Sequence, residues 1–225
     1  MSDPVSIPAN PAPFPLDPGG FALVLIDMQR DFLEPGGFGE SLGNDVGQLR
    51  RTIEPLRAVL AATRALGLPV VHTREGHLPD LSDCPPSKLN RGRPSQRIGD
   101  LGPNGRILIR GEYGHDIIDE LAPIAGEAVV DKPGKGAFHA TGFGDLLAAA
   151  GVRQLVVTGV TTEVCVHTTV REANDRGYDC LVLEDCVGSY FPEFQAAGLA
   201  MIAAQGGIFG CTASSADYLK ALAQI

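Results

Sequence analysis

The chain contains, at residues 154–169, the stretch QLVVTGVTTEVCVHTT. Its first seven residues form a largely apolar run, which is typical of a strand buried on both faces of a parallel sheet. From Glu163 onward the spacing favours a helix, with Thr161 or Thr162 as its cap. We therefore expect Cys165 in the first turn of a helix that leaves the carboxyl end of a strand.

Other apolar segments alternate with segments of helical spacing along the chain. The predicted strands are 21–26, 68–72, 128–131, 154–160, 180–183 and a short 207–209. The predicted helices are 47–66, 141–150, 165–177 and 193–205. This alternation predicts an α/β fold with a mostly parallel sheet covered by helices on both faces. Ligands in such folds bind beyond the carboxyl ends of the strands.

The composition excludes several classes of partner. The chain has 225 residues, is 44% hydrophobic and carries a formal net charge of −9. An acidic protein of this kind is a poor ligand for nucleic acid or for an anionic membrane surface, and no apolar run approaches the length of a membrane span. We expect one domain over residues 21–225, preceded by an irregular proline-rich arm, 1–20, which has no signal-peptide pattern.

The cysteines favour a reducing compartment. There are five, an odd number, with no CxxC pair and no structural-zinc spacing. Free thiols in a cytoplasmic protein are the simplest interpretation. The proline-rich arm and the long segment 73–113 are candidate contacts in a homo-oligomer, a dimer or a tetramer. Segment 73–113 has many prolines, glycines and arginines, and we expect it to form a lid or side wall of a pocket.

Three chemically distinct side chains follow predicted strands. Asp27 follows the first strand, Lys132 the third and Cys165 the fourth, so all three are expected at one edge of the sheet. Each has an ordinary alternative: a turn-forming Asp, a solvated turn Lys and a core Cys. Their coincidence at strand ends favours a catalytic site over three unrelated structural residues.

The residue types suggest nucleophilic catalysis. A nearby Lys132 and a helix N-terminus would lower the pKa of the Cys165 thiol, and Asp27 could accept its proton. The thiolate would attack an amide carbonyl, with the backbone N–H groups of Thr161 and Cys165 stabilising the oxyanion. Collapse would release ammonia and leave a thioester, which water would then hydrolyse.

The motifs that carry these residues resemble a known superfamily. LIDMQ at 25–29, DKP at 131–133 and GVTTEVC at 159–165 are similar to the isochorismatase-like cysteine hydrolases over about residues 20–215. The resemblance implies a three-layer α/β/α sandwich, a triad of Asp27, Lys132 and Cys165, and a cis peptide bond between Val160 and Thr161.

Within that superfamily, three stretches resemble the biuret and triuret hydrolases: HTREGH at 72–77, SQRIG at 95–99 and DKPGKGAF at 131–138. A fourth, MIAAQGGIFG at 201–210, resembles the segment of biuret hydrolase whose glutamine contacts the substrate. This resemblance implies that Phe32 is a wall of the pocket and that Lys135 and Gln205 contact the substrate. The alternatives are a solvated turn lysine at Lys135 and a helix-end residue at Gln205.

No metal or other cofactor is expected. The stretch at 72–77 lacks the Asp-x-His pattern by which nicotinamidases of the superfamily hold a metal, and the histidines are scattered. Arg74 and Glu75 are interpreted instead as a structural ion pair.

The favoured function is hydrolysis of a small neutral ureide, biuret, to urea-1-carboxylate and ammonia. Triuret hydrolysis is the next alternative. Another ureido or carbamoyl amide, such as N-carbamoylsarcosine or ureidoacrylate, follows, and the arginines at 91–110 could then bind the carboxylate. A hypothesis of a different class is a non-catalytic binding module on the same fold, against which the intact triad argues.

Overall fold

A parallel sheet of six strands forms the centre of the molecule. The computed structural model describes residues 4–225, and the strands lie in the order β10-β9-β8-β3-β4-β7. Their bounds are β3 Phe21–Ile26, β4 Val70–Glu75, β7 Ala128–Lys132, β8 Gln154–Val160, β9 Asp179–Gly188 and β10 Cys211–Ala213. The chain builds outward from β3 through β4 to β7, then returns to β8 on the other side of β3. The carboxyl ends of β3 and β8 therefore border a topological switch point, where ligands bind in such sheets.

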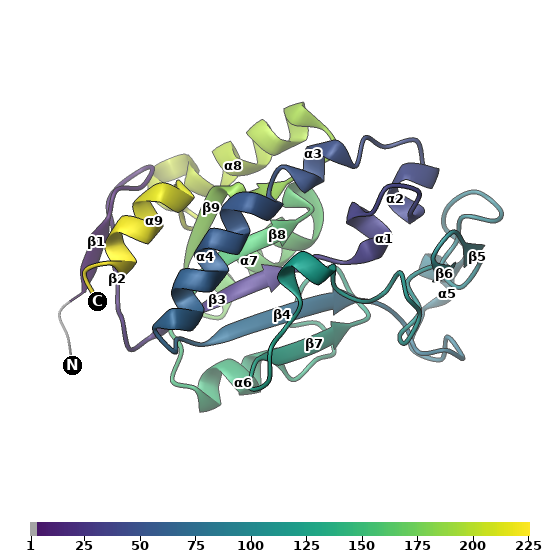
Figure 1. Ribbon diagram of the computed structural model, residues 1–225, viewed down its shortest axis with the longest axis horizontal. Coiled ribbons are helices and arrows are strands. Elements are labelled where there is room, and N and C mark those ends of the chain that lie inside the picture. Colours follow the sequence, from purple (N-terminus) through teal and green to yellow (C-terminus); the bar gives the residue numbers. More distant parts are fainter. Residues whose placement is uncertain (1–3) are drawn as a thin grey trace.

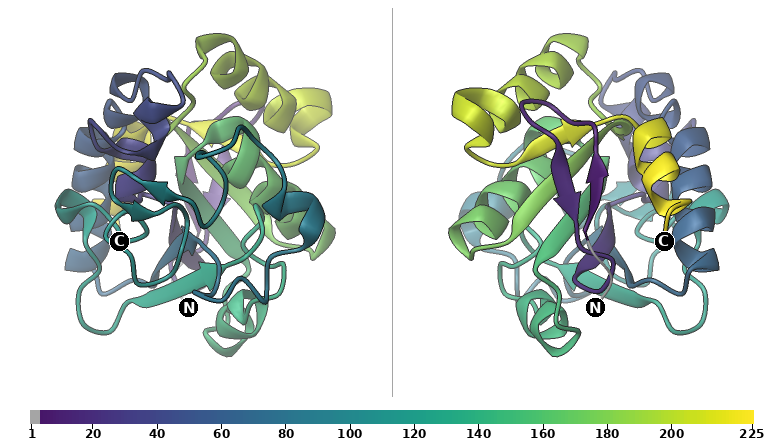
Figure 2. Two further views of the ribbon diagram at one scale, coloured as in Figure 1. Left: turned by 90° about the vertical axis from the view of Figure 1, so that its right-hand side faces the viewer. Right: turned by 90° about the vertical axis from the view of Figure 1, so that its left-hand side faces the viewer.

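Helices cover both faces of the sheet, and this confirms the three-layer α/β/α architecture (Figures 1 and 2). Side chains alternate along β3: Leu23 and Leu25 join one buried cluster, whereas Val24 and Ile26 join the other. The first cluster contains residues of α4 and α9, and the second contains residues of α6, α7 and α8. The helices are α1 Arg30–Leu33, α2 Phe38–Ser41, α3 Gly47–Arg50, α4 Ile53–Ala65, α5 Pro86–Leu89, α6 Phe143–Ala149, α7 His167–Asp175, α8 Pro192–Gly207 and α9 Ser215–Leu222.

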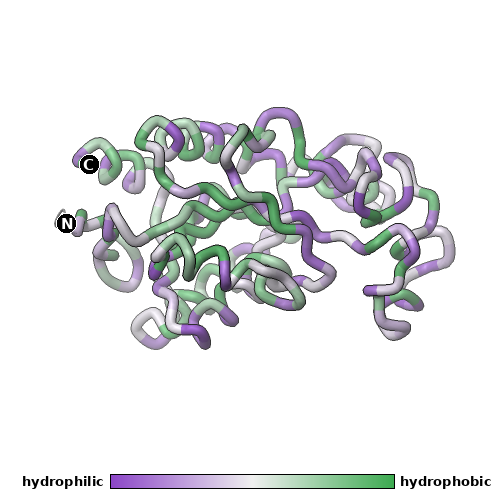
Figure 3. Tube along the Cα trace, turned by 90° about the horizontal axis from the view of Figure 1, so that it is seen from below, coloured by the Kyte–Doolittle hydropathy of each residue, from purple (hydrophilic) through white to green (hydrophobic). Residues whose placement is uncertain are grey.

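The apolar residues follow the sheet. Figure 3 shows the hydrophobic part of the chain concentrated along the central strands, with hydrophilic segments around them. Every residue of β3 and of β8 is buried, as the apolar runs predict for central strands of a parallel sheet. Among residues 4–225, no helix combines the length and the apolarity needed to cross a bilayer.

The prediction of an irregular N-terminal arm is wrong for the described residues. Strands β1 (Val5–Ile7) and β2 (Phe14–Leu16) pair as an antiparallel hairpin. Ile7, Phe14 and Leu16 are buried in the same cluster as α4 and α9. A strand of alternating apolar and polar residues can bury one face even when prolines are frequent. The hairpin is therefore packed onto the domain core.

The predicted last strand, 207–209, is also misplaced. These residues form the end of α8 and the turn after it, and the strand begins four residues later, at Cys211. Gln205, Gly206 and Gly207 have positive φ angles of 53°, 80° and 87°. Left-handed residues of this kind commonly end helices, and glycine adopts them without steric cost. The predicted helix 47–66 is likewise two elements, α3 and α4.

A long connection between β4 and β7 projects from the carboxyl edge of the sheet (Figure 1). It contains α5, the short antiparallel pair β5 (Leu101–Gly102) and β6 (Gly105–Arg106), and a 3₁₀ turn at Asp119–Leu121. Hydrogen bonds from His77 N to Leu108 O and from Arg110 N to His77 O hold the connection against its own start. Its placement beside the switch point makes it a wall of any site there.

Candidate active site

The structure brings the three predicted side chains to one place at the carboxyl edge of the sheet. Asp27 directly follows β3, Lys132 ends β7, and Cys165 lies in a π-helical turn, Thr162–Val166, that follows β8. Lys132 Nζ lies 2.7 Å from Asp27 Oδ2. The Cys165 sulfur lies within 4.8 Å of a carboxylate oxygen of Asp27. Cys165 is therefore close to Asp27, which pairs with Lys132, although it lies in a π-helical turn and not in the α-helical turn expected.

Asp27 is held rigidly by its neighbours. Its backbone has a φ of 51°, a left-handed conformation that is uncommon outside glycine. Its N–H donates to Thr73 O at 3.1 Å, and the Thr73 hydroxyl donates to Asp27 Oδ1 at 2.7 Å. These bonds hold the carboxylate beside Lys132 and near the Cys165 sulfur. Left-handed backbone at a residue other than glycine is typical of functional positions.

Lys132 supplies a permanent positive charge. Burial alone would lower its pKa, but Asp27, Cys165 and Glu75 outweigh burial and raise the pKa of Lys132 above its ordinary value. Its ammonium group also donates to Gly134 O at 3.0 Å and to Lys135 O at 2.9 Å. A lysine held in this way stays protonated and acts as a fixed cation, not as a base.

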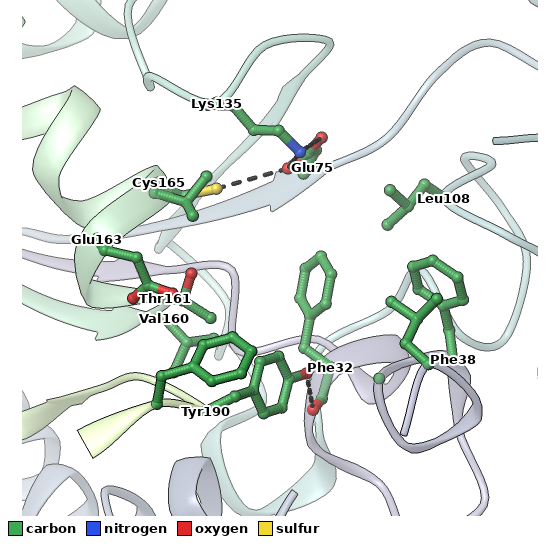
Figure 4. Close-up of a pocket in the computed structure, with 14 residues that line it drawn as sticks. Phe32, Phe38, Glu75, Leu108, Lys135, Val160, Thr161, Glu163, Cys165 and Tyr190 are labelled. Atoms are coloured by element: carbon green, nitrogen blue, oxygen red, sulfur yellow. Dashed lines mark hydrogen bonds and ion pairs between the residues drawn. The ribbon is translucent and has the colours of Figure 1, made fainter. Parts of the chain in front are cut away.

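Glu75 is a member of the site that sequence reasoning missed. Its carboxylate is buried at the end of β4, and Cys165 Sγ donates to its Oε2 at 3.5 Å (Figure 4). Lys135 Nζ lies 2.7 Å from Oε1 and 3.0 Å from Oε2, and Lys88 Nζ lies 3.2 Å from Oε1. Burial would raise the pKa of Glu75, but Lys135, Lys132 and Lys88 lower it to about 2.

The predicted Arg74–Glu75 ion pair is wrong. Arg74 instead pairs with Asp131 at 2.7 Å and with Asp116 at 2.9 Å. Successive side chains of a strand point to opposite faces, so Arg74 and Glu75 diverge. The signal that could have found Glu75 is its place at a strand end, like Asp27 and Lys132. The predicted strand 68–72 ended three residues short of it.

A buried glutamine fixes the backbone of Glu75. Gln29 Nε2 donates to Glu75 O and to His115 O, both at 2.9 Å, while Gln29 Oε1 accepts the Glu75 N–H at 2.7 Å. All hydrogen-bonding groups of this side chain except one oxygen lone pair are thus used. Gln29 therefore ties the segment after β3 to the end of β4 and sets where the Glu75 carboxylate begins.

The expected lowering of the Cys165 pKa is not found. Burial is the largest influence and raises the pKa of this thiol well above its ordinary value. Lys132 and Lys135 oppose the shift, whereas the carboxylates of Asp27 and Glu75 add to it. Cys165 is only 4% exposed, and two carboxylates near it offset the two cations. In this structure the group at rest is the thiol, so a base must remove its proton.

A cavity of about 290 Å³ opens onto the sulfur. Phe32, Lys135, Thr161 and Cys165 all line it, as the sequence predicted, and Leu108 places the long connection in its wall. Figure 4 shows the aromatic rings of Phe32, Phe38 and Tyr190 around the space. The full lining is Phe32, Phe38, Gly39, Leu42, Glu75, Leu108, Lys135, Val160, Thr161, Glu163, Val164, Cys165, Tyr190 and Phe191.

The backbone at the end of β8 is shaped for this cavity. The Val160–Thr161 peptide bond is cis, which confirms the expectation from the resemblance. Gly159 has a φ of 101°, and a Cβ there would collide with the backbone of Ile26. Only glycine allows β8 to approach β3 this closely just before the chain turns into the cavity.

The structure does not bring Gln205 to this cavity. Helix α8 begins beside the cavity, next to Phe191, and runs away from it; Gln205 is exposed near its far end. At 1.5 Å per residue, a helix of this length separates its two ends by roughly 20 Å. The assignment of Gln205 as a substrate contact within this chain is therefore wrong for the structure described.

One cluster of metal-ligand side chains is found among residues 4–225, consisting of Asp27, Glu75 and Cys165. Lys132 lies 2.7 Å from the first carboxylate and Lys135 lies 2.7 Å from the second. A metal ion would have to displace these ammonium groups or meet their repulsion. The two carboxylates are thus neutralised by lysines, a donor set that does not suit a metal ion.

Comparison with known proteins assigns the chain to a family. The sequence model of the isochorismatase domain matches residues 21–214. The chain belongs to the isochorismatase family. A family member, the ureidoacrylate amidohydrolase of Caulobacter segnis, is 30% identical over 233 residues, which cover 98% of this chain and 93% of that protein. The ureidoacrylate amidohydrolase of Azorhizobium caulinodans is 31% identical over 226 residues, 97% of each protein.

Solved structures agree. A cysteine hydrolase from Pseudomonas syringae pv. phaseolicola 1448A superposes with a TM-score of 0.79 at 27% identity, over 100% of this chain and 99% of that one. N-carbamoylsarcosine amidase from Thermoplasma acidophilum gives a TM-score of 0.66 at 27% identity, over 87% and 96% of the two chains. The chain therefore has the isochorismatase fold, and its family and relatives support hydrolysis of an amide as its reaction.

Proposed function

We propose that this protein is a cysteine amidohydrolase that removes the terminal amide of a small ureide as ammonia, through a thioester. The observation that carries the proposal is the Cys165 sulfur at a cavity, within 4.8 Å of carboxylate oxygens of Asp27 and Glu75. A nucleophile, a base and a fixed cation within reach of one another are the parts that acyl transfer requires.

The proton transfer is assigned to Asp27. Glu75 is the weaker candidate base because both of its oxygens already accept hydrogen bonds from lysines. Asp27 takes the Cys165 proton as the sulfur attacks the carbonyl carbon, and the backbone N–H groups of Thr161 and Cys165 bind the oxyanion. Asp27 then protonates the leaving nitrogen, ammonia departs, and the same carboxylate activates the water that hydrolyses the thioester.

Lys132 has a different part in this scheme. Its charge, 2.7 Å from Asp27, balances the carboxylate in a site closed to solvent and favours the thiolate that forms during attack. Since Lys132 stays protonated, it supplies electrostatic stabilisation throughout the cycle and exchanges no proton with substrate.

Among ureides, we favour biuret, with urea-1-carboxylate as the product. The charged residues that line the cavity are Lys135, Glu75 and Glu163, which give this lining one net negative charge. A neutral substrate suits it better than a carboxylate. Biuret is small and planar and matches a cavity of about 290 Å³ with aromatic walls. Triuret, with one more carbamoyl unit, is the longer alternative.

A second candidate is a carboxylate-bearing ureide. The relatives named as ureidoacrylate amidohydrolases favour it, as does the likeness to an N-carbamoylsarcosine amidase. The case for biuret is also weaker because Gln205, which was expected to contact biuret, does not lie at the cavity. If the substrate is a carboxylate-bearing ureide, Lys135, whose side chain is 44% exposed, would face its carboxylate.

The test is an ammonia assay with purified protein and a panel of amides. The panel is biuret, triuret, ureidoacrylate and N-carbamoylsarcosine, and Cys165→Ser is the inactive control. Turnover of biuret with the highest kcat/KM supports the first candidate, and a preference for ureidoacrylate supports the second. Lack of ammonia from every amide, with Cys165 still alkylated by iodoacetamide, would instead favour a binding module.

A further inference from the structure

The position of Glu75 beside Cys165 is not explained by the need to activate the thiol as a nucleophile. Its carboxylate stays anionic and lies 3.5 Å from Cys165 Sγ, where it adds to the rise in the thiol pKa. This opposes formation of the attacking thiolate. Lys135 and Lys88 already compensate this charge, but Oε2 also faces the sulfur and can therefore contact a group that is bound there.

We propose that Glu75 is the residue that selects the substrate: its Oε2 accepts the ureido N–H next to the scissile carbonyl. This inference rests on the proposed function and names the chemical group by which that site recognises its substrate. The ligand class is H₂N–CO–NH–R, in which the internal nitrogen must carry a hydrogen.

The two oxygens of Glu75 differ in how they are occupied. Oε1 accepts from Lys135 at 2.7 Å and from Lys88 at 3.2 Å. Oε2 accepts from Lys135 at 3.0 Å and, more weakly, from the Cys165 thiol at 3.5 Å. When Asp27 takes the thiol proton, Oε2 loses that donor. The oxygen that faces the sulfur is then free to accept another N–H, and a carboxylate accepts about four.

The geometry around the sulfur assigns the rest of the substrate. The scissile carbonyl carbon must lie next to Sγ, with its oxygen toward the N–H groups of Thr161 and Cys165 and its terminal NH₂ toward Asp27. The remaining substituent, the internal nitrogen, is then left to Glu75, whose carboxylate oxygen lies within 4.8 Å of both the sulfur and an Asp27 oxygen.

Lys135 extends this recognition by one group. Its ammonium is bonded to both Glu75 oxygens and also lines the cavity, so it can donate to the next acceptor along the substrate. An acceptor, Glu75, beside a donor, Lys135, complements the N–H and C=O of a ureide. Charge-assisted hydrogen bonds of this kind are stronger than neutral ones.

Wild-type protein tests the proposal with matched substrates. Biuret is compared with 3-methylbiuret, which lacks the internal N–H, and with 1-methylbiuret, which adds the same methyl group but keeps that N–H. N-carbamoylglycine and N-carbamoylsarcosine form a second pair that differs only in the internal N-methyl group. We expect 3-methylbiuret and N-carbamoylsarcosine to lose at least about 10-fold in kcat/KM relative to their partners, mainly through KM, while 1-methylbiuret loses less.

A variant separates Glu75 from simple crowding by the methyl group. In Glu75→Gln the preference for the N–H substrates should shrink at least about threefold, because a neutral amide oxygen is a weaker acceptor. Alkylation of Cys165 should also move to lower pH, since a negative charge beside the sulfur is removed. Glu127→Gln is the control: this carboxylate is paired with Arg64 and His72, precedes β7 at the opposite edge of the sheet, and should change neither measurement.

The outcomes are distinguishable. Equal kcat/KM for the methylated and unmethylated members of each pair overturns the role of Glu75 and leaves the amidohydrolase standing. A preference that is unchanged in a folded Glu75→Gln protein also overturns it. Lack of ammonia from every ureide overturns the proposed function and this inference together.

Discussion

Lys132 Nζ lies 2.7 Å from Asp27 Oδ2, and both side chains are completely shielded from solvent. Their charges are separated in the sequence by more than a hundred residues and joined in the structure by a single contact between two strand ends. In Lys132→Met, Asp27 is left as an uncompensated buried charge. We expect a loss of about 3–5 kcal/mol in the free energy of unfolding, measured by urea titration.

The double variant Asp27→Asn, Lys132→Met tests the cause of that loss. It removes both charges together, so much of the stability lost in Lys132→Met should return, although turnover should not. If the double variant is as unstable as the single one, the Lys132 side chain stabilises the fold by packing and not by its charge.

Cys165→Ser should fold normally and lose turnover. A serine hydroxyl can donate to Glu75 as the thiol does, so the free energy of unfolding should change by about 1 kcal/mol or less. Hydroxyl is a poorer nucleophile in this setting, and we expect kcat to fall at least about 1,000-fold. Ammonia release and thermal unfolding are the two measurements, and retained turnover would exclude the sulfur from the reaction.

The raised pKa of Cys165 predicts a particular pH dependence of alkylation. A thiol with an ordinary pKa of about 8.5 has reached most of its final reactivity by pH 9.5. Alkylation of Cys165 in the free protein should still be increasing there, because burial and the neighbouring carboxylates raise the pKa. Iodoacetamide rates, followed by mass spectrometry of the peptide that contains Cys165, measure this. In Lys132→Met the curve should move to still higher pH, since Lys132 lowers that pKa.

Glu75 should make the fold sensitive to acid. Its pKa is lowered from 4.5 to about 2, so its ion pairs contribute stability that is present above pH 4.5 and is lost as the pH falls toward 2. The free energy of unfolding of the wild type should decrease over this interval by a few kcal/mol more than that of Glu75→Gln. Parallel curves for the two proteins would show that the three lysines do not stabilise this carboxylate.

Lys88 links the long connection between β4 and β7 to the site, and its removal should make that connection more mobile. In the folded protein it donates to both Glu75 and the Pro133 carbonyl. In Lys88→Met we expect faster limited proteolysis within residues 78–100 and a several-fold rise in KM, with kcat changed by less than about threefold. Equal proteolysis rates in wild type and variant would show that the Lys88 contacts do not hold the connection in place.

The sequence was most informative where local pattern and position coincide. Asp27, Lys132 and Cys165 each follow an apolar run, so their common edge could be predicted from the parallel arrangement alone. Phe32 and Lys135 followed from motifs. Glu75 was missed because β4 extends to it past polar residues, where apolar patterning stops being a guide. Its partner Lys88 comes from an irregular connection, and contacts of that kind have no periodic signal.

Two further predictions failed, one because of the surroundings of Cys165 and the other because of the direction of helix α8. The pKa of Cys165 depends on burial and on two carboxylates, and neither can be read from residues 159–169 alone. Gln205 lies in a stretch that resembles a segment of biuret hydrolase, but helix α8 carries it away from the cavity within this chain. The resemblance suggested that this glutamine contacts the substrate, but its position depends on the direction of helix α8, which the resemblance did not give.

The N-terminal hairpin has a consequence for solubility. Asn10 exchanges two backbone hydrogen bonds with Thr212, of 2.8 and 2.9 Å, and so occupies part of the outer side of β10, the last strand of the sheet. Strands with unpaired outer sides recruit other chains and promote aggregation. Truncation before residue 17 would expose that side and also uncover the part of the core that Ile7, Phe14 and Leu16 cover. We expect the shortened protein to self-associate, as measured by size-exclusion chromatography, even though its catalytic groups are untouched.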